Sequence, residues 1–526
     1  MNIVVAEPLS PAGLALLKEQ PGWNVIVADP KTYAQHLGIA DALLVRSAVK
    51  VNQEVLAQAP FLKVIGRAGV GVDNVDVKAA TAAGVLVMNT PGGNAVSVAE
   101  HTIGLMLAMA RSIPQASAST KAGKWEKKKF MGNELRGKTL GIVGLGSIGR
   151  EVVRRARAFE MRIVASDPFV NSVTASELGV RLVSLDELYT SSDYITLHVA
   201  LTVETQGMIN DTSIAKMKDH VRIVNCARGE LIDGEALRRG IESGKIAGAS
   251  LDVFQTEPPA AGEPLLALDS VLATPHIGGS TEEAQEIVGV KIAEQVVGYL
   301  TQGIALNAVN VPAMTADQYK TVGPYATLAE QLGRFAAYVA QGNPKLVRLV
   351  YRGRIAEENT ILIRNAGLAG VLSRGMERKA NVVNAVQFAS DRGLVFSERH
   401  EKRSLHTDSV QLELETDSGT TIIEGAVVLD RPRLLRVDGV QCEGQLGVHM
   451  LYLKVDDVPG VVGHVGSVLG QNGVNIANFS LGRDAGSTPS QMVALIETDT
   501  SVTEPILQKL LSNPVVRKAR IVEVGG

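Results

Sequence analysis

Short apolar runs alternate with segments of helical periodicity over residues 1–95. Runs of aliphatic and β-branched residues with this length are typical of buried strands. Strands that alternate with helical segments favour a parallel sheet with crossover connections. The predicted strands are Asn2–Ala6, Asn24–Ala28, Ala42–Val45, Lys63–Ile65 and Val85–Met88, and residues 97–111 predict a long apolar helix.

A second pattern of the same kind begins at Thr139. A helix predicted near Thr281–Leu300 would carry the chain back to the first unit. The two patterns indicate an α/β protein with two doubly wound parallel-sheet domains. The predicted strands are Thr139–Val143, Arg162–Ser166, Tyr194–Leu197, Val221–Asn225, Ala247–Asp252 and Val271–Thr274.

The pattern changes after about residue 310. Residues 311–345 contain Pro312, Pro324 and Pro344 with a helical stretch between them. One helix-like patch, Asn365–Arg378, follows among alternating strands such as Ser409–Thr416 and Thr420–Val428. This arrangement predicts an α+β domain over 311–445 with antiparallel pairing.

Residues 446–526 follow the order strand, helix, strand, strand, helix, strand. This β-α-β-β-α-β order predicts a ferredoxin-like domain. The pieces are Gly447–Val455, Val461–Gln471, Asn475–Gly482, Gln491–Thr498, Glu504–Leu511 and Arg517–Val524.

Composition narrows the function classes. A length of 526 residues suits three or four domains, and a net charge of −3 argues against a nucleic-acid-binding protein. Two distant cysteines, Cys226 and Cys442, make no disulfide framework, which favours a reducing compartment. The first residues look like a strand, and no apolar stretch approaches the length of a bilayer span, so we expect a cytoplasmic protein. We expect no metal site.

The sequence Gly144-Leu145-Gly146-Ser147-Ile148-Gly149 fits the G-x-G-x-x-G fingerprint of dinucleotide binding. It lies between a predicted strand and a predicted helix, as the mechanism requires: the glycines allow a tight turn, close approach of the pyrophosphate and close helix packing. Asp167 ends the next strand. An acidic group there binds ribose hydroxyls and repels a 2′-phosphate, so NAD is the expected cofactor.

Three polar residues follow the carboxyl ends of predicted strands: Arg228, Glu257 and His276. Oxidation of a secondary alcohol needs a base for the hydroxyl proton, and imidazole titrates near neutral pH. A carboxylate such as Glu257 can orient that ring. Arg228 can bind the carboxylate of a 2-hydroxy acid through two parallel hydrogen bonds.

The chain resembles the D-isomer-specific 2-hydroxy acid dehydrogenases, and within them the long phosphoglycerate dehydrogenases. The resemblance to the phosphoglycerate dehydrogenases lies in KWEKKKFMG (124–132) and in the C-terminal extension. The resemblance to the wider dehydrogenase family lies in the motifs GRAGVGVDNVD (66–76), NTPGGNAVSVAEH (89–101), GLGSIG (144–149), NCARGE (225–230), LDVFQTEPP (251–259) and TPHIGGST (274–281).

The resemblance implies roles for individual residues. Arg228, Glu257 and His276 would be catalytic, and Lys127, Lys128 and Lys129 are either phosphate contacts or a solvated charge run. Ser147 departs from the Arg or Lys of many relatives. Cys226 fits cofactor packing better than nucleophilic catalysis. The implied NAD contacts are Val70, Ile148, Asp167, Val199, Cys226 and Asp252, and the implied substrate contacts are Arg46, Ser47, Arg67, Gly71 and Asn94.

The resemblance also implies a domain plan and a regulator. An NAD-binding domain (96–284) would be inserted into a substrate-binding domain (1–95 and 285–310). An intervening domain (311–445) would follow, which in the family joins subunits and can bind anions; Arg399, Lys402 and Arg403 are either an anion cluster or, as the favoured alternative, a solvated surface. Residues 446–526 resemble an ACT domain, in which Asp457 and Asn475 would bind L-serine; the alternative is a dimerisation module without a ligand.

The implied reaction is the NAD-dependent oxidation of 3-phospho-D-glycerate by a homodimer or homotetramer. Two alternatives stay open: a dehydrogenase for another D-2-hydroxy acid, and an NAD-sensing binding protein on the same scaffold. The complete set of Arg228, Glu257 and His276 argues for an enzyme.

Overall fold

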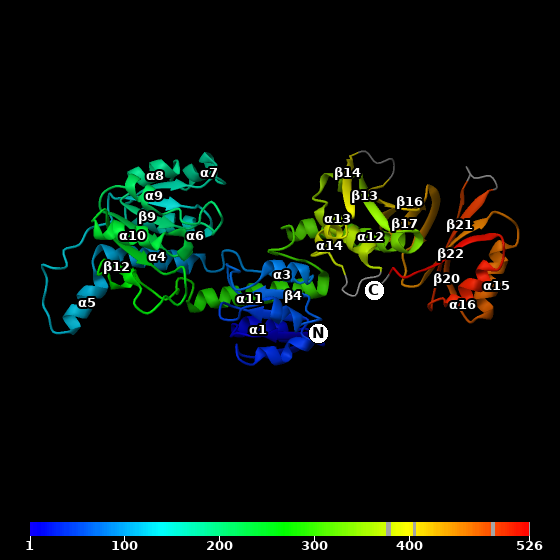
Figure 1. The fold of residues 1–526 in the computed structure, drawn as a ribbon, viewed down its shortest axis with the longest axis horizontal. Helices are drawn as coiled ribbons and strands as arrows, with labels where there is room; N and C mark the ends of the chain where they lie inside the picture. The colour runs from blue at the N-terminus through cyan, green and yellow to red at the C-terminus, as the bar shows by residue number, and fades with distance from the viewer. Residues whose placement is uncertain (375–379, 403–406, 485–489, 525–526) are drawn as a thin grey trace. The chain divides into compact units, whose positions relative to one another are not determined.

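The protein divides into two compact units in a computed structural model that describes residues 1–374, 380–402, 407–484 and 490–524. The first unit comprises residues 1–8, 14–89 and 292–526. The second comprises residues 9–13 and 90–291. Figure 1 shows both along the chain.

The first unit opens with a five-stranded parallel sheet in the order β2-β1-β3-β4-β5. This is a doubly wound order whose direction reverses between β1 and β3, where such folds bind ligands. Gly66 of β4 faces Ile292 and Val296 of helix α11, so that helix covers part of the sheet. The strands are β1 (Asn2–Val5), β2 (Asn24–Val27), β3 (Ala42–Val45), β4 (Val64–Arg67) and β5 (Leu86–Met88); the helices are α1 (Pro11–Lys18), α2 (Gln53–Ala57), α3 (Val77–Ala82) and α11 (Glu282–Gln302).

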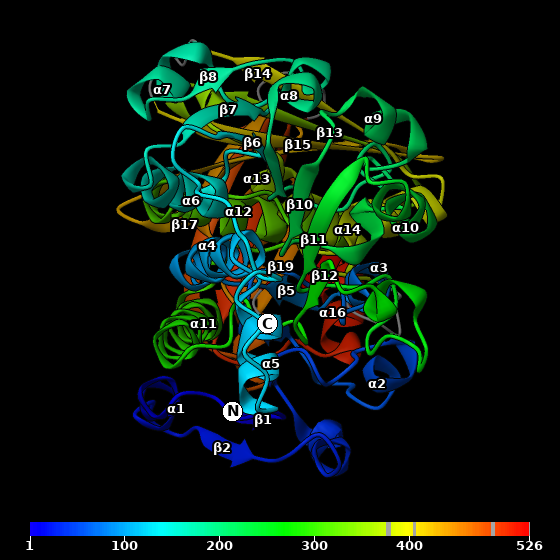
Figure 2. The same cartoon turned by 90° about the vertical axis from the view of Figure 1, so that its left-hand side faces the viewer.

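The second unit contains a seven-stranded parallel sheet in the order β12-β11-β10-β9-β6-β7-β8. Helices α4 and α6 lie on one face, and α9 and α10 lie on the other (Figure 2). The strands are β6 (Thr139–Val143), β7 (Arg162–Ser166), β8 (Arg181–Leu182), β9 (Tyr194–Leu197), β10 (Val221–Asn225), β11 (Ile246–Leu251) and β12 (Val271–Ala273). The helices are α4 (Ala95–Ala110), α5 (Ile113–Lys121), α6 (Ser147–Ala158), α7 (Ser172–Glu177), α8 (Leu185–Ser191), α9 (Asp211–Lys216) and α10 (Gly234–Glu242).

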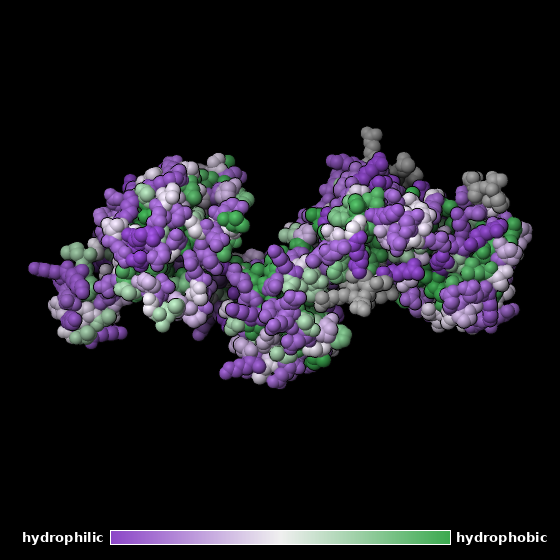
Figure 3. All heavy atoms as spheres, in the orientation of Figure 1, coloured by the Kyte–Doolittle hydropathy of each residue, from purple (hydrophilic) through white to green (hydrophobic). Residues whose placement is uncertain are grey.

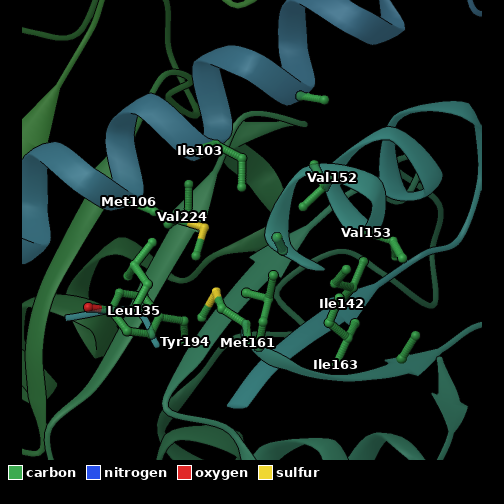
Figure 4. Close-up of a cluster of buried hydrophobic side chains, with 14 of the residues drawn as sticks. Ile103, Met106, Leu135, Ile142, Val152, Val153, Met161, Ile163, Tyr194 and Val224 are labelled. Carbon is green, nitrogen blue, oxygen red and sulfur yellow. The ribbon is translucent and has the colours of Figure 1, made fainter. Parts of the chain in front are cut away.

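Buried aliphatic side chains fill both faces of this sheet. Ile103 and Met106 of α4 join Val152 of α6 and Ile142 of β6 in one cluster (Figure 4). Continuous apolar strands are expected here, since a parallel sheet covered on both faces has no wet side. This packing fixes the strand ends from which the candidate site is built.

Helices α12 (Ala316–Val339) and α13 (Ile361–Leu372) cross at glycines in the first unit. A methyl group at Gly370 would lie 2.1 Å from the Glu330 carbonyl oxygen, and one at Gly333 would lie 2.3 Å from that of Gly367. The helices pack on a sheet in the order β14-β13-β15-β16-β17-β18, in which only β13 and β14 pair in parallel. The elements are β13 (Pro344–Arg352), α14 (Ala385–Asp391), β14 (Val395–Glu401), β15 (Ser409–Thr416), β16 (Gly419–Val428), β17 (Arg431–Val437) and β18 (Val440–Gln445).

The C-terminal sheet is antiparallel, in the order β20-β21-β19-β22. This sheet contacts β18 and α12 of the preceding region. Gly482 of β20 approaches the Gln441 carbonyl oxygen, and the rings of Phe335 and Tyr452 meet edge to face with their centroids 5.9 Å apart. The elements are β19 (Met450–Asp456), α15 (Val461–Gln471), β20 (Ile476–Asp484), β21 (Gln491–Thr498), α16 (Glu504–Leu511) and β22 (Val516–Val522).

The predicted fold class is confirmed: two parallel α/β sheets, then an α+β region with mainly antiparallel pairing, then the ferredoxin-like order. The helical stretch expected over residues 311–345 is α12, which contains Pro324 although proline cannot donate a backbone hydrogen bond. One pair of helix bounds was wrong. The helix predicted at Asn365–Arg378 begins at Ile361 and ends at Leu372, while Arg378 lies outside the described residues, as does Arg403.

Hydrophilic side chains predominate on the face of the protein drawn in Figure 3. No helix of the described residues is both long and apolar enough to cross a membrane.

Candidate active site

The glycine-rich turn between β6 and α6 is shaped to receive a dinucleotide. Gly144 adopts φ 96°, and a methyl group there would lie 2.5 Å from the His198 carbonyl oxygen. A methyl group at Gly149 would lie 2.1 Å from the Gly144 carbonyl oxygen, so that glycine permits the helix to pack on the turn. At Gly146 a methyl group would meet no described atom within 4 Å, which leaves this side of the turn open to a ligand.

The N-terminus of α6 faces this open side. It begins at Ser147, and no side chain of the described residues caps it. Free N–H groups and the positive end of a helix dipole favour a phosphate at such a position. The residues present therefore fit the pyrophosphate of NAD. Ser147 is exposed at the first helical position, and Val199 lies against Gly144.

Asp167 links β7 to the glycine-rich turn. One carboxylate oxygen accepts a hydrogen bond from the Leu145 N–H at 2.8 Å, and the other accepts one from the Phe169 N–H at 2.8 Å. The carboxylate therefore lies beside the turn, as ribose recognition requires.

His276 and Glu257 form a hydrogen-bonded pair. Nδ1 of His276 lies 2.7 Å from Oε2 of Glu257, and the side chains are 51% and 38% exposed. The Phe254 N–H donates to the other oxygen of Glu257 at 3.0 Å. The ring is thus oriented by a carboxylate that its own loop holds in place, and it stays accessible to a substrate.

The loop that carries His276 is held from beneath by Asp252, which is only 1% exposed. Its carboxylate accepts hydrogen bonds from the hydroxyl of Thr274 at 2.6 Å and from the N–H groups of Ile277 and Gly278 at 2.9 and 2.8 Å. Burial alone raises the pKa of Asp252, but hydrogen bonds from His101, Thr274 and the two N–H groups outweigh it and lower the pKa below its ordinary value. Asp252 therefore stays ionised under the loop of His276.

Arg228 follows β10 in a loop closed by Asn225. The Asn225 side chain donates to the Arg228 carbonyl oxygen at 2.8 Å and accepts from the Ala227 N–H at 3.0 Å. The next residue, Gly229, touches the loop of Glu257: a methyl group there would lie 2.0 Å from the Phe254 carbonyl carbon. The loops of Arg228 and Glu257 are therefore in direct backbone contact.

Cys226 is buried in the core beside this loop. Burial raises the pKa of its thiol to about 12, and the charge of Asp252 acts in the same direction. A thiol in that state is a poor nucleophile. The side chain belongs to the buried cluster that also contains Val224 and Met106, which favours the interpretation as a packing residue.

Asn94 precedes α4 and lies beside the His276 loop, because a methyl group at Gly279 would be 2.8 Å from its amide nitrogen. Its Oδ1 is buried and has no hydrogen-bond partner among the described residues. An acceptor in this condition is suited to a ligand hydroxyl.

The remaining substrate candidates belong to the first unit. Arg46 and Ser47 follow β3, half-buried and exposed respectively, and Arg67 ends β4 beside Gly69. Val70 and Gly71 lie in the next turn, where the Asn89 side chain donates to the Val70 carbonyl oxygen at 2.5 Å. The first unit thus brings these five residues to the carboxyl ends of β3 and β4.

Lys127, Lys128 and Lys129 are exposed in the segment after α5, which projects from the second unit in Figure 1. Trp125 and Met131 in the same segment are each 85% exposed. Large apolar side chains exposed beside a basic run are typical of interaction surfaces.

The two effector candidates lie at the loop after β19 and the start of β20. Asp457 pairs with Arg483, with 3.1 Å between Oδ2 and Nε, and the Asn475 amide donates to Asp499 at 2.6 Å. In the intervening region Arg399 pairs with Glu401 at 2.9 Å and Lys402 with Glu357 at 3.6 Å, so the two cations contact carboxylates.

Sequence reasoning missed several residues that hold the site. Asn225, Gly229, Thr274 and His101 lie inside the quoted motifs, but their partners are fixed only by the fold. His198 adjoins the glycine-rich turn, and burial lowers the pKa of its imidazole to about 4, so the ring is neutral. Among the described residues no group of His, Cys, Asp or Glu side chains could hold a metal ion.

Three families match successive parts of the chain. Residues 103–278 match the NAD binding domain of the D-isomer specific 2-hydroxyacid dehydrogenases. Residues 321–438 match the D-3-phosphoglycerate dehydrogenase intervening domain, and residues 449–515 match the ACT domain. The fold and site therefore define an NAD-dependent oxidoreductase of the 2-hydroxyacid dehydrogenase class.

Full-length relatives narrow the class. A D-3-phosphoglycerate dehydrogenase from Methanocaldococcus jannaschii is 42% identical over 530 residues, with 100% of both chains covered. One from Bacillus subtilis is 36% identical, with 99% of each chain covered. The chain belongs to the D-3-phosphoglycerate dehydrogenase family.

Solved structures resemble about 60% of the chain. A D-lactate dehydrogenase from Aquifex aeolicus, complexed with NAD and lactic acid, is 30% identical with a TM-score of 0.52, covering 60% of this chain and 100% of its own. An NAD-dependent formate dehydrogenase from Staphylococcus aureus in complex with NAD is 28% identical with a TM-score of 0.53, over 60% and 100%.

Proposed function

We propose that this chain oxidises 3-phospho-D-glycerate to 3-phosphooxypyruvate with NAD, the first step of L-serine biosynthesis. The observation that carries the proposal is the 2.7 Å contact between His276 Nδ1 and Glu257 Oε2 in a unit with a dinucleotide turn. Full-length relatives named for this activity support the choice of substrate.

His276 acts as the base in the proposed mechanism. Its Nδ1–H donates to Glu257, which leaves Nε2 to accept the proton of the substrate's C2 hydroxyl. Glu257 keeps the ring in this tautomer and stabilises the imidazolium that forms. NAD, when bound, accepts the hydride that leaves C2.

Arg228 binds the substrate carboxylate and polarises the C2 oxygen in this proposal. Its loop touches the loop of Glu257 through Gly229, which supports joint action of the two side chains. Arg46, Ser47, Arg67, Gly71 and Asn94 complete the proposed substrate site.

NAD is held in this proposal by the glycine-rich turn and the strand ends around it. Asp167 binds the adenosine ribose, and the N–H groups at the start of α6 bind the pyrophosphate. The other proposed contacts are Val70, Gly144, Gly146, Ser147, Ile148, Gly149, Val199, Cys226 and Asp252.

The domain plan and the assembly are part of the proposal. Residues 96–284 form the NAD-binding domain, 1–95 and 285–310 the substrate domain, 311–445 the intervening domain and 446–526 the ACT domain. The exposed Trp125 and Met131 support pairing of two chains through the segment that carries Lys127–Lys129, which then binds the substrate phosphate. Two buried free thiols, Cys226 and Cys442, support a reducing compartment, the cytoplasm.

L-serine is the proposed effector of the ACT domain. Asp457 accepts from its ammonium group, and Asn475 contacts the ligand bound by a paired copy. Asp457 lies at the end of the ACT sheet where β19 finishes, and Asn475 lies at the opposite end, where β20 begins. Both already pair with polar neighbours, Arg483 and Asp499, which a ligand would have to displace or join.

The test is NADH formation from 3-phosphoglycerate at alkaline pH, with D-lactate and D-glycerate as controls. Turnover confined to the phosphorylated acid is the expected result, and addition of L-serine should suppress it. Turnover of an unphosphorylated acid alone would overturn the substrate, and activity insensitive to L-serine would overturn the effector.

An NAD-sensing binding protein is the rival from another class. It would bind NADH yet turn over none of the three hydroxy acids in either direction. The assay therefore separates the two functions directly.

A further inference from the structure

A buried carboxylate lies at the switch point of the first sheet. Glu7 follows β1, is 6% exposed, and belongs to the same unit as the loop after β3. Its Oε1 accepts hydrogen bonds from the N–H groups of Arg46 at 2.8 Å and Val49 at 2.9 Å, and its Oε2 accepts one from Ala48 at 3.1 Å. Three backbone donors from one loop thus converge on one side chain.

Asn74 holds the same loop from the other side. Its amide donates to the carbonyl oxygens of Arg46 at 2.9 Å and Val49 at 2.7 Å, while its own carbonyl oxygen accepts from the Val51 N–H at 2.8 Å. The backbone of residues 46–49 is therefore bonded through both its N–H and its C=O groups.

A buried charge is costly unless hydrogen bonds compensate it, and bonds to an ionised acceptor are about twice as strong as neutral ones. The three hydrogen bonds that compensate the buried carboxylate of Glu7 form only when the loop 46–49 has its present conformation. The loop, in turn, lies at the carboxyl ends of β1 and β3, where the strand order reverses and such sheets bind ligands.

We propose that Glu7 is a positioning residue for substrate binding: its carboxylate shapes the loop 46–49 so that Arg46 and Ser47 are presented to the substrate. This inference rests on the proposed function, because it uses 3-phosphoglycerate as the substrate that Arg46 and Ser47 hold. The three hydrogen bonds of Glu7 described above all come from backbone N–H groups of the loop. Its effect on substrate binding therefore passes through Arg46 and Ser47.

Glu7→Gln tests the proposal, since it keeps the size of the side chain but turns one acceptor into a donor that faces an N–H group. We expect the KM for 3-phosphoglycerate to rise about tenfold, while kcat and the KM for NAD stay within about twofold. This pattern is expected because the variant would weaken binding of the substrate and of the transition state equally. Glu7→Asp, which keeps the charge, should recover part of the loss. In Arg46→Ala, adding Glu7→Gln should raise the KM by much less than tenfold.

Asp41→Asn is the matched control. Asp41 also accepts a backbone N–H in this sheet, from Asn2 at 2.8 Å, and pairs with Lys63, but it precedes β3 at the opposite edge. This variant should lose stability without a change in the KM for 3-phosphoglycerate.

Hydrogen exchange of the full-length protein without substrate gives a readout independent of activity. Amide protons in a peptide spanning 46–49 should exchange faster in Glu7→Gln and not in Asp41→Asn. Unchanged exchange there, or an equal rise in both KM values with a lower kcat, would overturn the positioning role. If the natural protein fails to turn over 3-phosphoglycerate, the proposed function falls, while the exchange result still decides whether Glu7 holds the loop.

Discussion

At the scale of single residues, the site depends on carboxylates that orient other groups. Asp167, Asp252 and Glu257 each accept a backbone N–H, and each stands beside a group with a proposed role. The sequence indicated Asp167 and Glu257 because they follow strand ends, and the family resemblance indicated Asp252. Glu7 escaped prediction because its partners lie 39 to 42 residues away along the chain and carry no motif of their own.

Glu257→Gln should lower kcat by about 100-fold with little change in the KM for NAD. An amide at this position cannot stabilise an imidazolium, and its NH₂ group can favour the wrong tautomer of His276. Steady-state kinetics of the variant measure the loss. Glu263→Gln, in the same loop, is the control and should retain natural kcat; an unchanged kcat in Glu257→Gln would contradict the assignment of His276 as the oriented base.

Asp252 predicts a dependence of stability on pH. Because its pKa is lowered in the folded protein, the ionised form stabilises the fold above the unfolded pKa of about 3.9, and this contribution is lost as pH falls through the folded value. The melting temperature should therefore fall between about pH 5 and pH 3, and fall less in Asp252→Asn. Equal acid sensitivity of the two proteins would exclude Asp252 as a source.

At the scale of elements, the strand–turn–helix of the dinucleotide site was predictable because all its requirements are local. The close contacts of Gly144 and Gly149 lie within a few residues or at an adjoining strand end, and Gly146 faces open space. Strands β13, β14, β17 and β18 were not located individually among the alternating strands expected in this region. The first three carry three charged residues each, and pairing with neighbours in the mixed sheet selects the extended form of all four.

Two alanine substitutions separate binding from folding in this turn. Gly146→Ala places its methyl group in open space, so the fold should persist while the KM for NAD rises about tenfold or more. Gly149→Ala forces a methyl group onto the Gly144 carbonyl oxygen and should destabilise the protein by about 1–3 kcal/mol. Kinetics and thermal melting measure both variants; the reverse assignment of effects would contradict the geometry of the turn.

At the scale of the whole molecule, the chain forms two compact units with separate cores. We expect calorimetry to resolve two unfolding transitions, and the transition of the second unit, which carries the glycine-rich turn, should respond more strongly to NAD than that of the first. At about 100 times its dissociation constant, NAD adds about 2.7 kcal/mol, which raises that transition by roughly 5–10 °C. In Gly146→Ala the shift should shrink at the same NAD concentration. One transition that moves as a whole would show that the units unfold together.

The path of α11 has a consequence for synthesis of the protein. All five strands of the first sheet lie within the first 88 residues, but Ile292 and Val296, which cover Gly66 of that sheet, emerge from the ribosome roughly 200 residues later. At about 5–20 residues per second, part of one apolar face stays bare for roughly 10–40 seconds while the entire second unit is made. During that interval the nascent chain is an expected client for a chaperone that binds exposed aliphatic surface, and the last turns of α11 end the need for it.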